Sequence, residues 1–137
     1  GHIFNANWFR MTLQRILYVE DEPLVQTIAK VALVKVGGFN LRICDSGAQA
    51  LQEVKAFAPQ LILLDVVMPG MDGPATLVQL RQDPDTAAIP VVFLTANTDP
   101  KEIAHYRPLG AVDVIAKPYN PMTLAEQVRQ VWAAHHA

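Results

Sequence analysis

The chain has 137 residues, of which 51% are hydrophobic and 18% charged, with a formal net charge of −2. This composition is typical of one soluble globular domain. The charge balance gives no indication of the basic surface that nucleic acid binding requires, and no apolar run reaches the ~20 residues of a membrane span. The single cysteine, Cys44, excludes an internal disulfide and favours a reducing, cytoplasmic compartment.

The first ten residues, GHIFNANWFR, precede Met11 and lack the apolar core of a signal peptide. We interpret residues 1–10 as an expression-tag remnant and expect residues 11–137 to form a single domain. A native N-terminal arm is the alternative interpretation.

From Arg15 onward, short apolar runs alternate with longer amphipathic ones. Strands are predicted at 15–19, 40–46, 61–67, 91–96 and 112–118. Helices are predicted at 23–38, 46–59, 72–82, 99–110 and 120–136. Ser46 and Asn120 are the predicted N-caps of the second and fifth helices. In the first helix Leu24, Ile28, Val31 and Ala32 recur at helical spacing. The strand at 40–46 alternates in polarity as an edge or half-buried strand does.

Five strands that are each followed by a helix predict an α/β fold, with a parallel sheet, right-handed crossovers and helices on both faces. In such a sheet the functional site lies beyond the carboxyl ends of the strands. Asp45, at the end of the second strand, is expected to be peripheral. Acids, a hydroxyl and an amine follow the other four strands: Glu20, Asp21, Glu22, Asp65, Thr95 and Lys117.

This set of residues has a chemical meaning. Carboxylates from Glu20, Asp21 and Asp65 would suit Mg²⁺, which would offset their mutual repulsion. Asp65 could attack a phosphoryl group, and the metal, the Lys117 ammonium and the Thr95 hydroxyl could neutralise the developing charge. Each residue taken singly could equally be an ordinary loop or cap residue, and the hypothesis depends on their serial order.

Four segments, ILYVEDEP, LILLDVVMPGMDG, VVFLTA and GAVDVIAKPYNP, resemble in order and spacing the receiver domain of two-component response regulators. The resemblance runs from Arg15 to about Ala133. It implies a flavodoxin-like, doubly wound five-stranded parallel sheet of order 2-1-3-4-5 with five helices on both faces. On this basis residues 11–137 are expected to be a single receiver domain.

The resemblance also implies roles for individual residues. Asp65 would be the phosphoacceptor, and the Mg²⁺ ligands would be Glu20, Asp21, Asp65 and the backbone carbonyl of Val67. The phosphoryl-binding and switch residues would be Thr95, Ala96 and Lys117, and a cis peptide would precede Pro118. Val67 and Asn97 would tune the access of hydrolytic water, and Gly70 and Gly73 would be turn glycines.

The function implied is a phosphorylation switch. A sensor histidine kinase or a histidine phosphotransfer protein would phosphorylate Asp65, and the helix 4–strand 5–helix 5 surface would shift. The chain would be a signalling domain and not an enzyme, with at most slow self-dephosphorylation. We expect no direct nucleic acid binding, no membrane contact, an unidentified downstream protein and possible homodimers on phosphorylation. The final helix lacks an obvious linker, which favours a stand-alone regulator.

One position departs from the family. Many members have an aromatic residue three positions before the lysine, and it moves together with the threonine; this chain has Val114 there. Either the coupling lacks an aromatic side chain or another ring, Tyr106 or Tyr119, substitutes. The interpretation favoured for both tyrosines is ordinary, partly buried packing.

The sequence also bears on three other functions. A degenerate receiver that acts as a phosphorylation-independent interaction module is kept open by Val114. A phosphatase of the haloacid-dehalogenase class would need a second acid two residues after the nucleophile, where Val67 stands. A flavin or nucleotide module is disfavoured because the sequence has neither a P-loop nor a G-x-G-x-x-G motif.

Overall fold

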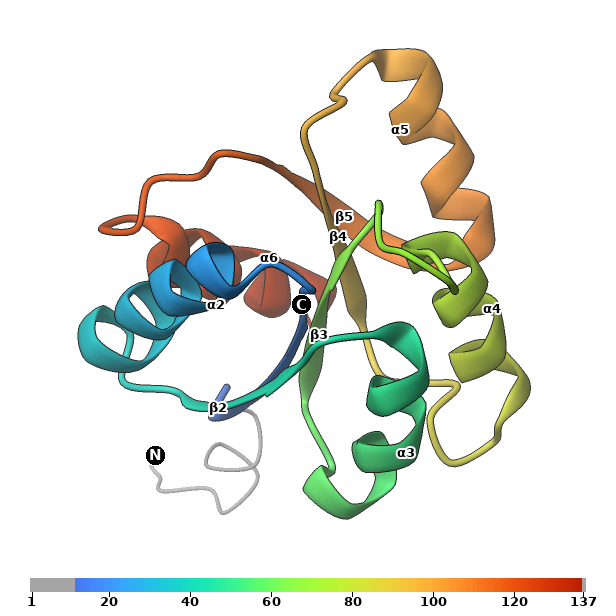
Figure 1. The fold of residues 1–137 in the computed structure, drawn as a ribbon, viewed down its shortest axis with the longest axis horizontal. Coiled ribbons are helices and arrows are strands. Elements are labelled where there is room, and N and C mark those ends of the chain that lie inside the picture. Colours follow the sequence, from blue (N-terminus) through green and yellow to red (C-terminus); the bar gives the residue numbers. More distant parts are fainter. Residues whose placement is uncertain (1–11, 137) are drawn as a thin grey trace, which may run out of the picture.

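A five-stranded parallel sheet lies between two layers of helices in the computed structural model, which describes residues 12–136 (Figure 1). Residues 1–10, predicted to be a tag remnant, lie outside the described residues. The strands are β1 (Arg15–Val19), β2 (Asn40–Cys44), β3 (Leu61–Asp65), β4 (Val91–Thr95) and β5 (Ala111–Ala116). Their order in the sheet is β2-β1-β3-β4-β5, as the resemblance implied.

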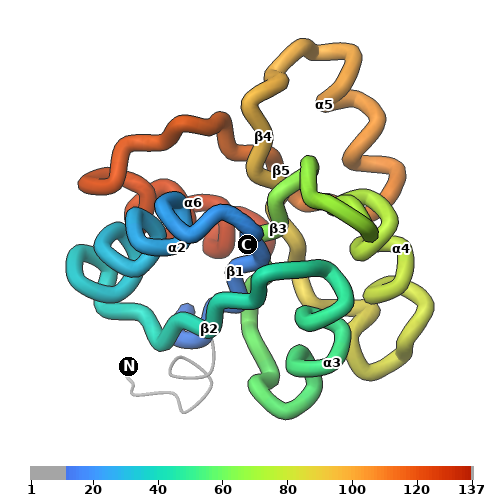
Figure 2. The backbone as a smooth tube through the Cα atoms, in the orientation of Figure 1, coloured from blue at the N-terminus to red at the C-terminus, as the bar shows by residue number. Residues whose placement is uncertain are grey.

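The helical elements are α2 (Pro23–Lys30), α3 (Gly47–Phe57), α4 (Gly73–Gln82), α5 (Pro100–Tyr106) and α6 (Leu124–His135), with a π-helix at Val31–Val36 and a 3₁₀ turn at Arg107–Leu109. The backbone trace shows α2 and α6 on one face of the sheet and α3, α4 and α5 on the other (Figure 2). Among residues 12–136, no helix combines the length and apolar character needed to cross a membrane.

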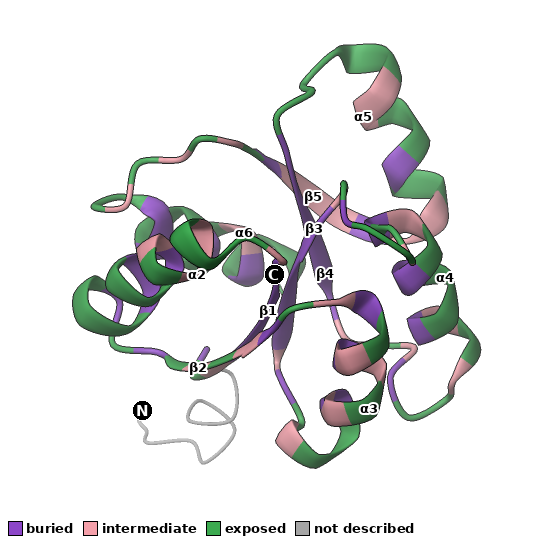
Figure 3. Ribbon diagram, in the orientation of Figure 1, coloured by how far each residue is buried: buried purple, intermediate pink, exposed green. Residues whose placement is uncertain are grey.

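The burial of each strand depends on which faces of the sheet the helices cover. Every residue of β3 and β4 is buried, because both strands are central and covered on both faces (Figure 3). Ile16 and Tyr18 of β1 belong to the core under α2 and α6, whereas Leu17 and Val19 belong to the core under α3, α4 and α5. The edge strand β2 is more exposed, as its alternating sequence predicted.

The first helix differs from its prediction. It is α-helical only to Lys30 and continues as the π-helix, in which each turn contains an additional residue. The buried side chains are Ala29, Ala32 and Leu33, whereas Leu24 is 72% exposed. Leu24 lies in the first turn of α2, directly after the three residues that follow β1, and its side chain faces solvent.

The predicted caps have different outcomes. Ser46 caps α3, because its hydroxyl accepts a hydrogen bond from the Gln49 backbone N–H at 3.0 Å. The prediction for Asn120 is wrong: its side chain accepts from the Met122 N–H at 2.9 Å and closes a turn ahead of α6. Thr123 occupies the N-cap position, and the helix begins at Leu124.

Cys44 gives a simple test of the packing around β2. Its side chain is fully buried, and burial, followed by the nearby Glu53 carboxylate, raises the pKa of the thiol to about 12. Because the thiolate is the reactive form, we expect iodoacetamide at about pH 8 to leave the folded protein unlabelled and to label it fully in guanidinium. Intact mass measures both states, and rapid labelling of the folded protein would contradict the expectation.

Candidate functional site

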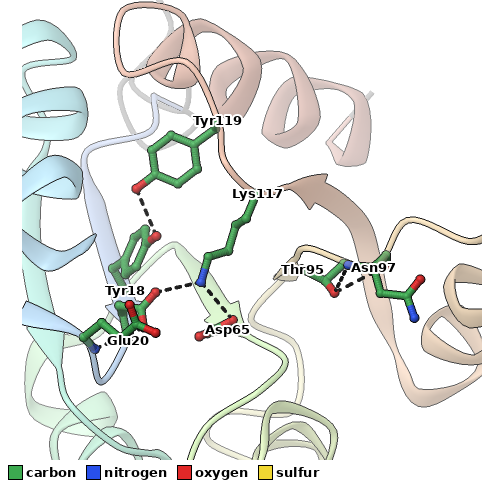
Figure 4. Close-up of polar contacts among 8 residues, drawn as sticks. Tyr18, Glu20, Asp65, Thr95, Asn97, Lys117 and Tyr119 are labelled. Atoms are coloured by element: carbon green, nitrogen blue, oxygen red, sulfur yellow. Dashed lines mark hydrogen bonds and ion pairs between the residues drawn. The ribbon is translucent and has the colours of Figure 1, made fainter. Parts of the chain in front are cut away.

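Four neighbouring strands bring the predicted site residues to one edge of the sheet (Figure 4). Glu20 follows β1, and Asp65 and Thr95 are the last residues of β3 and β4. Lys117 follows β5 directly. Because all these strands are parallel, their carboxyl ends lie side by side, and residues up to 97 positions apart in sequence become neighbours.

An ion network of Glu20, Asp65 and Lys117 lies at the centre of this edge. The Lys117 Nζ donates to Glu20 Oε1 at 2.9 Å and lies 3.3 Å from Asp65 Oδ1. Glu20 is fully buried, and its other carboxylate oxygen accepts from the Glu22 backbone N–H at 3.2 Å. The lysine therefore provides the counter-charge for two buried acids.

This environment shifts the protonation of Asp65. Burial raises the pKa of its carboxyl to about 6, and the Glu20 carboxylate adds to the rise, while Lys117 opposes it. Burial acts to lower the pKa of Lys117, but the hydrogen bond to Glu20 and the charges of both acids outweigh it, so the pKa of the ammonium is raised. The site thus holds an excess of negative charge that a single ammonium offsets only in part.

A cation would balance that excess. Glu20, Asp21 and Asp65 each offer a carboxylate oxygen, and these atoms lie within 4.8 Å of one another. Hard oxygen donors at such separations fit Mg²⁺, which prefers carboxylates and water. Val67 stands two residues after Asp65, in the loop after β3, with its side chain 77% exposed.

Thr95 and its neighbours form the other half of the site. The buried Thr95 hydroxyl accepts from the Asn97 backbone N–H at 3.0 Å and donates to the Asn97 carbonyl at 3.4 Å, a long and weak contact. Ala96 and Asn97 are exposed beside it. The peptide bond between Lys117 and Pro118 is cis.

Two glycines shape the loop after Asp65. Gly70 has a φ of +73°, a conformation that only glycine adopts readily. Gly73, the first residue of α4, packs against the Asp65 backbone: a Cβ atom there would lie 2.4 Å from the Asp65 carbonyl oxygen. The absence of a side chain at Gly73 therefore lets α4 begin directly beneath the strand end that carries Asp65.

Two contacts were not foreseen from the sequence. The Tyr18 and Tyr119 hydroxyls are 3.0 Å apart, which joins β1 to the loop after Lys117 (Figure 4). Burial raises the pKa of both phenols. Tyr106 is buried on the opposite face of the sheet, with its ring 4.9 Å from that of Phe93 in an edge-to-face arrangement. A tyrosine inside an apolar strand signals burial, but it does not reveal its partner.

The fold and this edge define a flavodoxin-like α/β domain with an acidic site and a lysine. The chain belongs to the response regulator receiver domain family, which matches residues 16–129. Receiver domains in general bind Mg²⁺, and response regulators work with sensor histidine kinases.

Curated relatives agree with this assignment. The DNA-binding response regulator MtrA of Mycolicibacterium smegmatis is 37% identical over 116 residues, which are 85% of this chain and 49% of the relative. The probable transcriptional regulator ycf27 of Porphyridium aerugineum is 32% identical over 121 residues, 88% of this chain and 49% of the relative. The chain thus spans about half the length of these relatives. Their names lend no support to our expectation that nucleic acid binding is absent.

Solved structures agree as well. The chemotaxis protein CheY4 of Vibrio cholerae superimposes with a TM-score of 0.81 at 25% identity, over 88% of this chain and 99% of that one. A putative response regulator from Chloroflexus aurantiacus gives a TM-score of 0.80 at 31% identity, over 89% of this chain and 99% of that one. The signal receiver domain of a signal transduction histidine kinase from Syntrophus aciditrophicus gives a TM-score of 0.76 at 34% identity, over 88% of this chain and 91% of that one.

Proposed function

We propose that residues 11–137 form a single receiver domain in which Asp65 accepts a phosphoryl group in a Mg²⁺-dependent reaction. The observation that carries the proposal is the position of Asp65 between two further carboxylates and the Lys117 ammonium. The donor is a phosphohistidine on a sensor histidine kinase or a phosphotransfer protein, and the reaction takes place in the cytoplasm.

The transfer is a displacement at phosphorus. A carboxylate oxygen of Asp65 forms a bond to the phosphorus atom while the bond from phosphorus to the donor's imidazole nitrogen breaks, and that nitrogen keeps the electron pair. Glu20, Asp21, Asp65 and the Val67 carbonyl would hold the metal, which when bound supplies positive charge against the phosphoryl oxygens. Lys117, already 3.3 Å from Asp65, supplies a second positive charge.

Phosphorylation then adds roughly two negative charges and new acceptor oxygens. Thr95 gives up its 3.4 Å contact with the Asn97 carbonyl and donates to the phosphoryl group instead. The surface that changes comprises α5, β5 and α6, and it is the surface for a downstream protein and for possible homodimers. Water slowly hydrolyses the acyl phosphate, with Val67 and Asn97 controlling its access.

The first test is an intact-mass assay with acetyl phosphate. In the presence of Mg²⁺ the protein should gain one phosphoryl group. The gain should disappear with a chelator and in Asp65→Asn, which removes the nucleophile. Asp45→Asn is the matched control, because Asp45 is an exposed acid directly after β2 that takes no part in the ion pairs of Lys117.

Lack of any phosphoryl gain in the folded wild-type protein would overturn the proposal. The chain would then be a degenerate receiver, an interaction module that retains the fold without the chemistry. A gain that persists in Asp65→Asn would place the phosphoacceptor elsewhere.

A further inference from the structure

Two side-chain hydrogen bonds connect β1 with the segment directly after β5, although these strands are not neighbours. β3 and β4 lie between them, so three strand spacings, roughly 14 Å, separate β1 from β5. Lys117 Nζ donates to Glu20 at 2.9 Å, and the Tyr18 and Tyr119 hydroxyls lie 3.0 Å apart, one donating to the other. Figure 4 shows Lys117 and Tyr119 extending over the edge of the sheet toward these partners. Whether Lys117 reaches the acids therefore depends on the position of residues 117–119.

The two hydrogen bonds lie close together along both parts of the chain. Tyr18 and Glu20 are two positions apart at the end of β1, and Lys117 and Tyr119 are two positions apart after β5. Tyr18 belongs to a strand and has none of its surface exposed, and Tyr119 packs against the same hydrophobic core. The tyrosine pair thus attaches the segment to a rigid strand, two residues from the lysine.

Apolar packing alone does not fix the position of this segment. A cavity of about 310 Å³ lies beside it, lined by Ile28 of α2 and by Lys117, Pro118 and Tyr119 among other residues. Most of the lining residues are apolar, and apolar contacts are not directional. A hydrogen bond does prefer a direction, and leaving the buried Tyr18 hydroxyl unpaired would be unfavourable. The hydroxyl pair is therefore the contact that sets the position of Tyr119.

We propose that Tyr119 is a positioning residue for phosphoryl transfer, because its hydrogen bond to Tyr18 holds residues 117–119 where the Lys117 ammonium contacts both Glu20 and Asp65. This inference rests on the proposed function, in which Lys117 supplies positive charge to the phosphoryl oxygens. Without the Tyr119 hydroxyl the segment gains freedom beside the cavity, and Lys117 spends less time on the acids. A displaced charge stabilises the transition state less well.

The first measurement follows the Lys117 ammonium by ¹⁵N NMR in the metal-free protein. A hydrogen-bonded, partly buried ammonium exchanges its protons with water slowly enough to be observed, and the absence of the signal from Lys117→Met assigns it. The wild-type protein should show this signal, and Tyr119→Phe should lose it. Tyr106→Phe is the matched control: it also removes one tyrosine hydroxyl, but from the core on the other side of the sheet, so the signal should persist.

The double variant Tyr18→Phe/Tyr119→Phe separates positioning from stability. It removes both hydroxyls of the pair and leaves neither of them unpaired, so its free energy of unfolding should exceed that of Tyr119→Phe. The hydrogen bond is still absent, so the ammonium signal should stay lost. A signal that returned together with the stability would mean that the pair has a structural role only, which would overturn the inference.

The second measurement is the rate of phosphoryl gain from acetyl phosphate with Mg²⁺, followed by intact mass. The rate should fall about 5-fold in Tyr119→Phe and in the double variant, the size expected for the loss of one hydrogen bond. An unchanged rate, or an ammonium signal that persists in Tyr119→Phe, would overturn the inference. Failure of the wild-type protein to gain a phosphoryl group would instead overturn the proposed function, and the NMR measurement does not depend on that gain.

Discussion

Replacement of Lys117 by methionine is expected to lower the free energy of unfolding of the metal-free protein by about 3 kcal/mol, because it leaves buried acids without their partner. Glu20 has none of its surface exposed, and Asp65 has 5%. Their one ammonium partner among the described residues is Lys117, at 2.9 and 3.3 Å. Methionine preserves most of the side-chain length, so the loss of stability measures the removal of the charge and not the creation of a cavity.

Chemical denaturation in the presence of a chelator measures this loss. Lys101→Met is the control, because Lys101 is exposed on α5 and its removal should change little. The loss should shrink as pH falls below about 6, since protonation of Asp65 relieves the repulsion. Added Mg²⁺ should restore part of the stability of Lys117→Met by binding the folded state. A loss under about 1 kcal/mol would mean that the ion pairs contribute little.

The sheet could be predicted from the sequence because each element has a pattern of its own. LILLD and VVFLT have apolar side chains on both faces of the strand, which indicates central strands. The structure confirms this, because every residue of β3 and β4 is buried. The π-helix could not be predicted in this way. VALVKV continues the apolar spacing of α2 closely enough that the sequence does not reveal the change in hydrogen bonding at Val31.

The topology of the sheet predicts that the site residues lie close together, but it does not predict which side chains are in contact. Parallel strands place their carboxyl ends together, so Glu20, Asp65 and Lys117 had to converge. Whether Lys117 pairs with one acid or with both depends on side-chain reach in three dimensions. The same holds for Tyr18 and Tyr119, which are 101 positions apart, and for Tyr106, whose ring contact with Phe93 depends on the position of α5.

Replacement of Asp65 by asparagine should have the opposite effect on stability to Lys117→Met. A pKa raised to about 6 from an ordinary value of 3.8 means that the fold disfavours the charged carboxylate by about 3 kcal/mol. Asparagine has nearly the same shape and no charge, and it leaves the Glu20–Lys117 pair intact. We therefore expect the free energy of unfolding to rise by about 1–3 kcal/mol in the metal-free protein at neutral pH.

The pH dependence gives this expectation a sign that can be checked. The folded state binds the Asp65 proton more tightly than the unfolded state, so the wild-type protein loses stability from this group as pH rises from about 4 to about 6. The advantage of Asp65→Asn should be full above about pH 6 and vanish toward pH 4. Denaturation at several pH values measures it, with Asp45→Asn as the exposed control. Lower stability of Asp65→Asn at neutral pH would mean that attraction to Lys117 outweighs burial and the repulsion from Glu20. In that case the acids would lack the excess negative charge that favours Mg²⁺ at this site.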